Sequence, residues 1–181
     1  MMSRSYSDEG IVLARRNFGE ADRILSIYTK SHGRISAVAK GIRRLTSKKR
    51  GHLEVFSHIK FQIADGKGMG ILTEVETLNN FGIIRKDLKK VSLTYYFTEV
   101  VGKITHEHER NDGIFELILN YLEKLQFETR LRSLRLNFIL ELLTITGFWP
   151  KGKKLLNPDE KLEEVIERGI NSIRVGKKIL I

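Results

Sequence analysis

The feature that most constrains this chain is a change in its hydrophobic period near residue 85. Residues 57–63 alternate between apolar and polar side chains, which is the two-residue period of a half-buried strand. From about residue 85 the apolar residues recur every three to four positions, the period of an amphipathic helix. The first helical stripe comprises Leu93, Phe97, Val100 and Ile104. Strands followed by helices predict the α+β class.

The first 80 residues contain five segments that favour strands. Besides 57–63, these are residues 10–16, 23–29, 34–40 and 71–78, which are short and mostly separated by glycine-containing turns. Gly66-Lys67-Gly68 lies in one such turn, and it lacks the spacing and the Ser or Thr of a phosphate-binding loop. Five short antiparallel strands suit a small closed barrel, which we expect over residues 1–80.

Residues 81–181 are expected to form a helical domain. The third helix, predicted over 129–146, is apolar on two sides, with Leu136 and Leu140 on the second side. It should therefore be the central and most buried helix. Gly147 should end it, and Asn157-Pro158 should begin another helix, because Asn is a favoured N-cap and proline suits the first helical position.

The positive charge is concentrated in one window. The formal net charge is +10, and residues 30–50 hold eight basic side chains and no acidic one. Long cations on a loop between barrel strands can reach phosphates without reading base sequence, although many such runs only keep a surface soluble. The residues predicted to bind DNA are Arg34, Lys40, Arg43, Arg44, Lys48, Lys49 and Arg50.

Aromatic side chains on the barrel are the second class of candidates. Phe18, Tyr28 and Phe56 could stack on bases, but a small barrel also needs aromatic residues to fill its core. Tyr95, Tyr96 and Phe97 are expected in the core of the helical domain.

The sequence offers no catalytic residue, metal or cofactor site, so we do not expect an enzyme. It has no cysteine, which excludes disulfides, thiol nucleophiles and cysteine-ligated zinc. His106 and His108 are two residues apart at an expected polar helix end, where they diverge. The carboxylates of Asp8, Glu9, Glu20 and Asp22 are expected to cap turns, Asp22 with a nearby Arg as a possible partner. No segment resembles a signal peptide or a membrane span, which favours a soluble cytoplasmic protein.

Several ordered motifs over about residues 8–150 resemble the RecO family of bacterial recombination mediators. The motifs are Glu9-Gly10-Ile11-Val12-Leu13, Gly19-Glu20-Ala21-Asp22-Arg23, Gly33-Arg34-Ile35, Ala37-Val38-Ala39-Lys40-Gly41 with Arg43-Arg44, Gly66-Lys67-Gly68-Met69-Gly70, the strand over 72–78, and Gly147-Phe148-Trp149-Pro150. Many members continue with a four-cysteine zinc module, whereas residues 151–181 contain no cysteine and end after about 30 residues. Zinc is therefore not expected in this short form.

The resemblance implies an OB-fold barrel followed by a helical bundle. It also implies binding of single- and double-stranded DNA, annealing of complementary strands, and loading of RecA together with RecR and single-strand binding protein in the RecFOR pathway of DNA repair. The acidic tail of single-strand binding protein would dock on the helical domain, and the protein would be cytoplasmic and associated with the nucleoid. From the residues alone, two other classes stay open: a general RNA-binding OB protein, because phosphate contacts do not distinguish the sugars, and a metal-dependent nuclease, if the four carboxylates converge.

Overall fold

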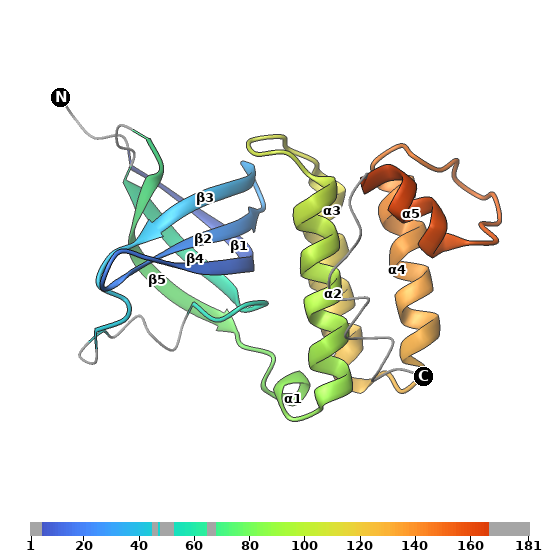
Figure 1. Ribbon diagram of the computed structural model, residues 1–181, viewed down its shortest axis with the longest axis horizontal. Helices are drawn as coiled ribbons and strands as arrows, with labels where there is room; N and C mark the ends of the chain where they lie inside the picture. Colours follow the sequence, from blue (N-terminus) through green and yellow to red (C-terminus); the bar gives the residue numbers. More distant parts are fainter. Residues whose placement is uncertain (1–4, 45–46, 48–52, 65–67, 167–181) are drawn as a thin grey trace. The chain divides into compact units, whose positions relative to one another are not determined.

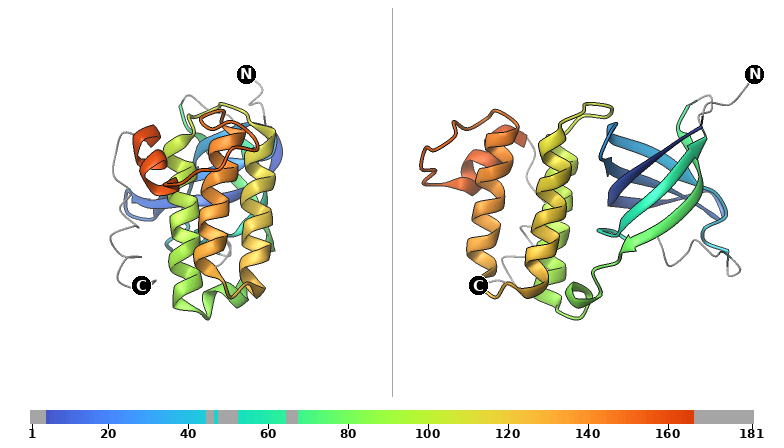
Figure 2. Two further views of the ribbon diagram at one scale, coloured as in Figure 1. Left: turned by 90° about the vertical axis from the view of Figure 1, so that its right-hand side faces the viewer. Right: turned by 180° about the vertical axis from the view of Figure 1, so that it is seen from behind.

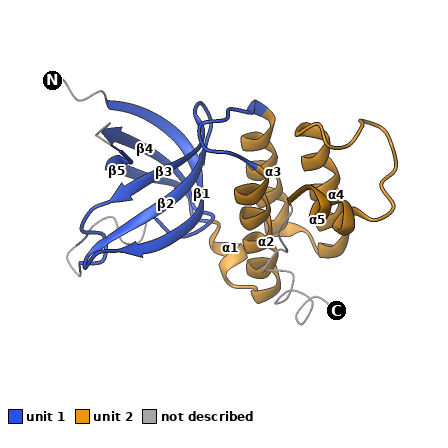
Figure 3. Cartoon of the chain, turned by 45° about the horizontal axis from the view of Figure 1, so that its top comes forward, with its two compact units in different colours: residues 1–80, 105–112 blue, residues 81–104, 113–181 orange. Residues whose placement is uncertain are grey.

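The computed structural model describes residues 5–44, 47, 53–64 and 68–166. Two compact units make up the chain, and Figure 3 colours them separately. The first unit comprises residues 1–80 and 105–112, and the second comprises residues 81–104 and 113–181. Residues 105–112 thus return to the first unit from within the helical part of the sequence, an excursion that the hydrophobic pattern does not signal.

The first unit is a closed five-stranded barrel, seen in Figure 1. Its strands are β1 (Ser5–Phe18), β2 (Asp22–Thr29), β3 (Gly33–Ala39), β4 (His58–Ala64) and β5 (Gly70–Asn79). They close in the order β1-β2-β3-β5-β4, which with β4 returning to β1 is the arrangement of an OB fold. The α+β class and the barrel are therefore confirmed.

One strand pair differs from the all-antiparallel barrel expected from the sequence. β3 and β5 are parallel and pair only at Ala37 with Gly70 and at Val38 with Ile71, whereas every other neighbouring pair is antiparallel. The reason is topological, because closure places β5 rather than β4 beside β3, and two strands that are not joined by a hairpin are free to run in the same direction.

The alternation in β4 directs its apolar residues into the barrel. Ile59, Phe61 and Ile63 are buried in the core, while Lys60 between them is exposed. His58 breaks the pattern, since it is buried although it lies on the polar face, and its Nε2 lies 2.8 Å from Glu9 Oε1. This contact satisfies a ring nitrogen that burial would otherwise leave without a partner.

The second unit consists of helices, arranged as Figures 1 and 2 show. They are α1 (Gly82–Arg85), α2 (Leu88–Ile104), α3 (Asp112–Phe127), α4 (Leu131–Ile145) and α5 (Pro158–Ile166). An aromatic cluster joins the first three long helices: the ring centroids of Phe97 and Phe138 are 4.1 Å apart, and those of Tyr121 and Phe138 are 5.2 Å apart. Such ring pairs add to the free energy of area burial alone.

The expectation that the third long helix is the most buried was wrong. Leu136 and Leu140 of α4 are only half-buried, whereas α2 and α3 each bury more residues than α4. The second apolar side of α4 is thus only partly covered, with α5 as one neighbouring helix. Tyr95 was also misplaced, because it is exposed while Tyr96 and Phe97 are buried.

The ends of α4 and α5 follow their sequence signals. α4 stops at Ile145, and Gly147 adopts a φ of 81° that glycine tolerates without strain. α5 begins at Pro158, with Asp159 and Glu160 in its first turn. Within the described part of the chain, no helix is long and apolar enough to cross a membrane.

Residues 105–112 form an irregular connection along β3 rather than the expected polar helix end. The His108 N–H donates to the Arg34 carbonyl at 2.8 Å, and the Tyr28 hydroxyl donates to the Asn111 carbonyl at 3.2 Å. Because β3 pairs with β5 only at its carboxyl end, the edge near Arg34 has unpaired backbone groups that this connection partly satisfies.

Candidate nucleic-acid interface

The cationic connection between β3 and β4 is anchored in the barrel core on both sides. Ile42 near its start and Leu53 near its end are fully buried members of the core cluster that lines the barrel. The ten residues between them, 43–52, must therefore leave the barrel surface and return to it. Lys48, Lys49 and Arg50, which the charge pattern also predicted, lie outside the described residues.

Hydrogen bonds fix the first part of this connection, residues 40–44, to the turn between β1 and β2; we call these five residues the cationic stem. The Gly41 N–H donates to Asp22 Oδ1 at 2.7 Å, and the Arg43 N–H donates to the Ala21 carbonyl at 2.9 Å. Arg43 Nη1 also donates to the Gly19 carbonyl at 3.2 Å. Asp22 thus caps a turn as predicted, but its recorded bond is to the backbone of the stem and not to an arginine.

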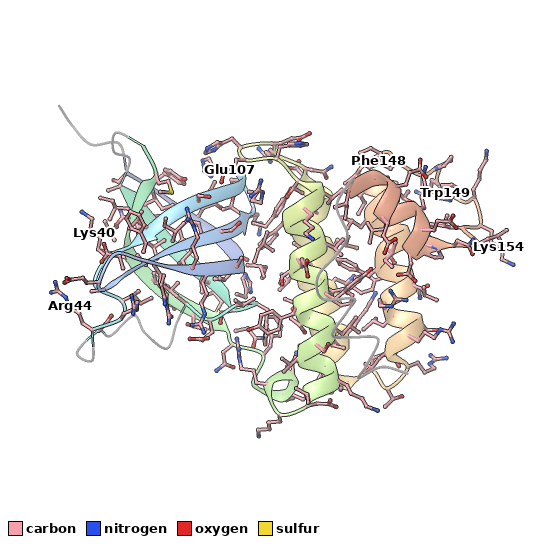
Figure 4. All side chains as sticks on the ribbon, viewed as in Figure 1. Lys40, Arg44, Glu107, Phe148, Trp149 and Lys154 are labelled. Carbon is pink, nitrogen blue, oxygen red and sulfur yellow. The ribbon has the colours of Figure 1, made fainter. Side chains whose placement is uncertain are left out.

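The stem presents its cations to solvent. Lys40, Arg43 and Arg44 are exposed, and none of them forms an ion pair with an acid in the described ranges. Figure 4 shows Lys40 and Arg44 at the same end of the barrel. The backbone is held while the long side chains stay free to move, which is the arrangement that lets a surface follow a phosphate chain.

Two further arginines border the same turn and were missed by the window of high charge. Arg16 near the end of β1 is exposed, and Arg23 at the start of β2 donates from Nε to Asn17 Oδ1 at 3.3 Å. Both flank the Gly19 turn in sequence, so a search around the turn, rather than along a continuous run of charge, would have found them.

Arg34 does not lie with the stem. It is near the start of β3, whereas Lys40 follows the end of that strand, and Figure 4 labels its neighbour Glu107 well away from Lys40. Arg34 Nε donates to the Thr105 carbonyl at 3.2 Å, and its Nη1 lies 4.0 Å from Glu107 Oε1. Its guanidinium therefore ties the 105–112 connection to the barrel.

The carboxylates that a nuclease would need contact separate partners. Asp8 Oδ2 lies 2.6 Å from His32 Nδ1, and Glu9 pairs with His58. Glu20 is exposed, and Asp22 accepts from the stem. These carboxylates therefore do not converge, and no group of three potential metal ligands occurs among the residues that the structure describes.

Only one of the three aromatic candidates is available for stacking. Tyr28 and Phe56 are buried, and burial raises the pKa of Tyr28 to about 12. Phe18 is 48% exposed at the end of β1. It precedes Gly19, whose carbonyl accepts from Arg43, so an exposed ring and the cationic stem meet at one turn.

Comparison with known proteins identifies relatives along most of the chain. A family model described as "Recombination protein O N terminal" matches residues 2–81, and one described as "Recombination protein O C terminal" matches residues 85–156. The DNA repair protein RecO of Dehalococcoides mccartyi is 32% identical over 157 residues, which are 87% of this chain and 62% of that protein. The RecO of Roseiflexus sp. is 33% identical over 151 residues, or 83% and 53% of the two chains. The chain thus spans between about half and two thirds of the length of these relatives.

Proposed function

The chain belongs to the RecO family of DNA repair and recombination proteins, and from this premise we propose that its barrel binds the phosphate backbone of DNA through the cationic stem. The observation that carries the proposal is the combination of exposed, unpaired Lys40 and Arg44 with a backbone pinned by Asp22 and anchored by Ile42. Contacts of this kind position a strand without reading its sequence.

Arg43 contributes to the same surface in two ways. Its guanidinium is exposed toward solvent, yet one of its N–H groups holds the Gly19 carbonyl. A substitution at Arg43 would therefore change both the charge and the shape of the turn. Lys40 and Arg44 are the cleaner positions for a test.

Phe18 adds a contact that a single strand can use and a duplex cannot. Its exposed ring lies one residue from the carbonyl that Arg43 holds. Stacking of a base on an aromatic ring contributes about 1–3 kcal/mol in proteins that bind single strands. We therefore propose that the barrel binds both forms of DNA through the stem and prefers the single strand through Phe18.

The wider activity proposed here follows from the family. The protein would anneal complementary strands without nucleotide, metal or catalytic turnover, since a cationic surface lowers the repulsion between two polyanions. It would act in the cytoplasm with RecR and with the tail of single-strand binding protein to help load RecA. The stem supports the DNA-binding part of this activity, whereas the protein partners are proposed from family membership alone.

The test compares two charge-matched double variants. Lys40→Ala with Arg44→Ala removes two stem cations, and Lys60→Ala with Lys86→Ala removes two exposed cations from β4 and from the start of the helical unit. Binding of an oligo-dT strand is measured by fluorescence anisotropy over a range of salt concentrations. The stem variant should bind more weakly, and its log–log salt slope should fall by about 1.4, since each lost single-strand contact removes about 0.7.

The outcome decides between contact and general charge. If both double variants lose the same affinity and slope, the stem is only part of a diffuse positive surface and the proposal is wrong. A matched RNA strand is titrated in parallel. Tighter binding of the RNA would favour the general RNA-binding alternative, because phosphate contacts alone do not select DNA.

A further inference from the structure

A second cationic and aromatic surface lies in the helical unit, on the connection between α4 and α5. After Gly147 this connection contains Phe148 and Trp149, followed by three lysines, and no acidic residue occurs between Glu141 and Asp159. Phe148 is 49% exposed. The three lysines, all exposed, are Lys151, Lys153 and Lys154. Figure 4 labels Phe148, Trp149 and Lys154 on this part of the chain.

Hydrogen bonds hold the connection in a defined shape. The Trp149 N–H donates to the Leu143 carbonyl at 3.0 Å, which fixes the chain to the end of α4. The indole Nε1 of Trp149 donates to the Lys153 carbonyl at 3.0 Å, and the Lys153 N–H lies 3.4 Å from the Pro150 carbonyl that accepts it. The lysines thus project from a loop closed across its base by Trp149, which lowers the entropy lost when a ligand orders it.

The charges of these lysines are not neutralised by the acids of α5 in the described region. Lys151, Lys153 and Lys154 form no ion pair there. Two of the four α5 carboxylates already have partners: Asp159 accepts from Arg135, with Nη2 at 2.9 Å, and Glu164 pairs with Lys161. The lysine ammonium groups therefore remain available to an anionic ligand.

We propose that this connection, residues 147–157, is a second binding site for single-stranded nucleic acid, separate from the barrel site. An exposed ring beside unpaired lysines matches what a single strand offers, since its bases can stack on the ring while its phosphates meet the cations. A duplex keeps its bases paired, so it can use only the lysines. The inference rests on the proposed function and deepens it, because a chain with two strand sites can hold both strands that are to be annealed.

The protein carries its own reporter for this site. Trp149 is the only tryptophan in the chain, so emission excited selectively at tryptophan arises from this loop alone. Titration of the full chain with oligo-dT should change that emission to a saturating value. The change should persist in the Lys40→Ala and Arg44→Ala variant of the barrel site, because that variant leaves the connection intact.

Two variants of the connection test the separate contacts. Phe148→Ala should weaken the binding seen by Trp149 emission by roughly fivefold or more, the loss of about one stacked base. Lys153→Ala with Lys154→Ala should lower the salt slope of the same signal by about 1.4. The matched control is Lys86→Ala with Lys89→Ala, which removes two exposed cations elsewhere in the helical unit and should leave the signal unchanged.

The outcomes separate this inference from the proposed function. If anisotropy shows that oligo-dT is bound while Trp149 emission stays constant, the second site does not exist, and the barrel proposal stands. If emission changes but the stem variant binds normally by both measurements, the barrel proposal fails and this one holds. Stronger emission changes with poly-glutamate or with phosphatidylglycerol vesicles than with oligo-dT would also overturn it, since the loop would then serve an acidic peptide or a membrane surface.

Discussion

Asp22 is the residue whose replacement tests most directly whether the shape of the stem, and not only its charge, matters for DNA binding. Its carboxylate accepts the Gly41 N–H at 2.7 Å and is half-buried. Asp22→Ala removes this acceptor together with one negative charge beside the cations. Asp22→Asn removes the same charge but keeps an oxygen that can accept the bond.

The two effects have opposite signs. Loss of a nearby negative charge strengthens phosphate binding, by up to about fivefold because a charge a few ångströms away in water contributes up to ~1 kcal/mol. Loss of a hydrogen bond to a carboxylate, with its donor left without a partner, costs about 1–2 kcal/mol at a half-buried position. We therefore expect Asp22→Asn to bind DNA more tightly than the parent and Asp22→Ala to bind more weakly than Asp22→Asn, by about fivefold.

Two measurements check this expectation. Hydrogen exchange of the amides in β1, β2 and β3 gives the local free energy of opening in the barrel, which should fall by about 1–2 kcal/mol in the alanine variant only. Anisotropy with oligo-dT gives the affinities of both variants. Equal affinity and equal exchange for the alanine and asparagine variants would refute the reasoning, because the stem would then need no brace from Asp22.

Two other predictions concern the barrel and its covering connection. Gly33→Ala should destabilise the barrel by at least ~2 kcal/mol in chemical unfolding, because Gly33 has a φ of 68° and an added Cβ would lie 2.2 Å from the Glu109 carbonyl oxygen; the matched change Gly102→Ala, in α2 with open space, should instead stabilise its helix by up to about 1 kcal/mol. Burial raises the pKa of Tyr28 from 10.0 to about 12, so its contribution to stability is complete below about pH 10 and is lost as the pH rises to 12. The stability difference between the parent and Tyr28→Phe, measured by denaturant unfolding, should therefore narrow over that range, and a constant difference would contradict the assignment.

The sequence alone determined the features that depend on neighbours within a few residues. The alternation in residues 57–63 and the helical stripe from Leu93 both follow from side-chain periodicity, so the strands and helices were found close to their true positions. Gly147 and Pro158 were readable as helix boundaries because their backbone preferences are local. The concentration of cations around Arg43 and Arg44 was likewise visible, since charge along a loop needs no partner to be noticed.

The tertiary structure decided which of these residues meet. Arg34 belongs to the same charged window as Lys40, but its side chain contacts Thr105, 71 positions away, and this contact gives it a structural role. Tyr28 and Phe18 are both aromatic residues of the barrel sequence, and only packing buried one and left the other exposed beside the stem. Pairings between distant segments depend on the free energy of the whole packed barrel rather than on local preference, and for this reason no pattern in the sequence reveals them.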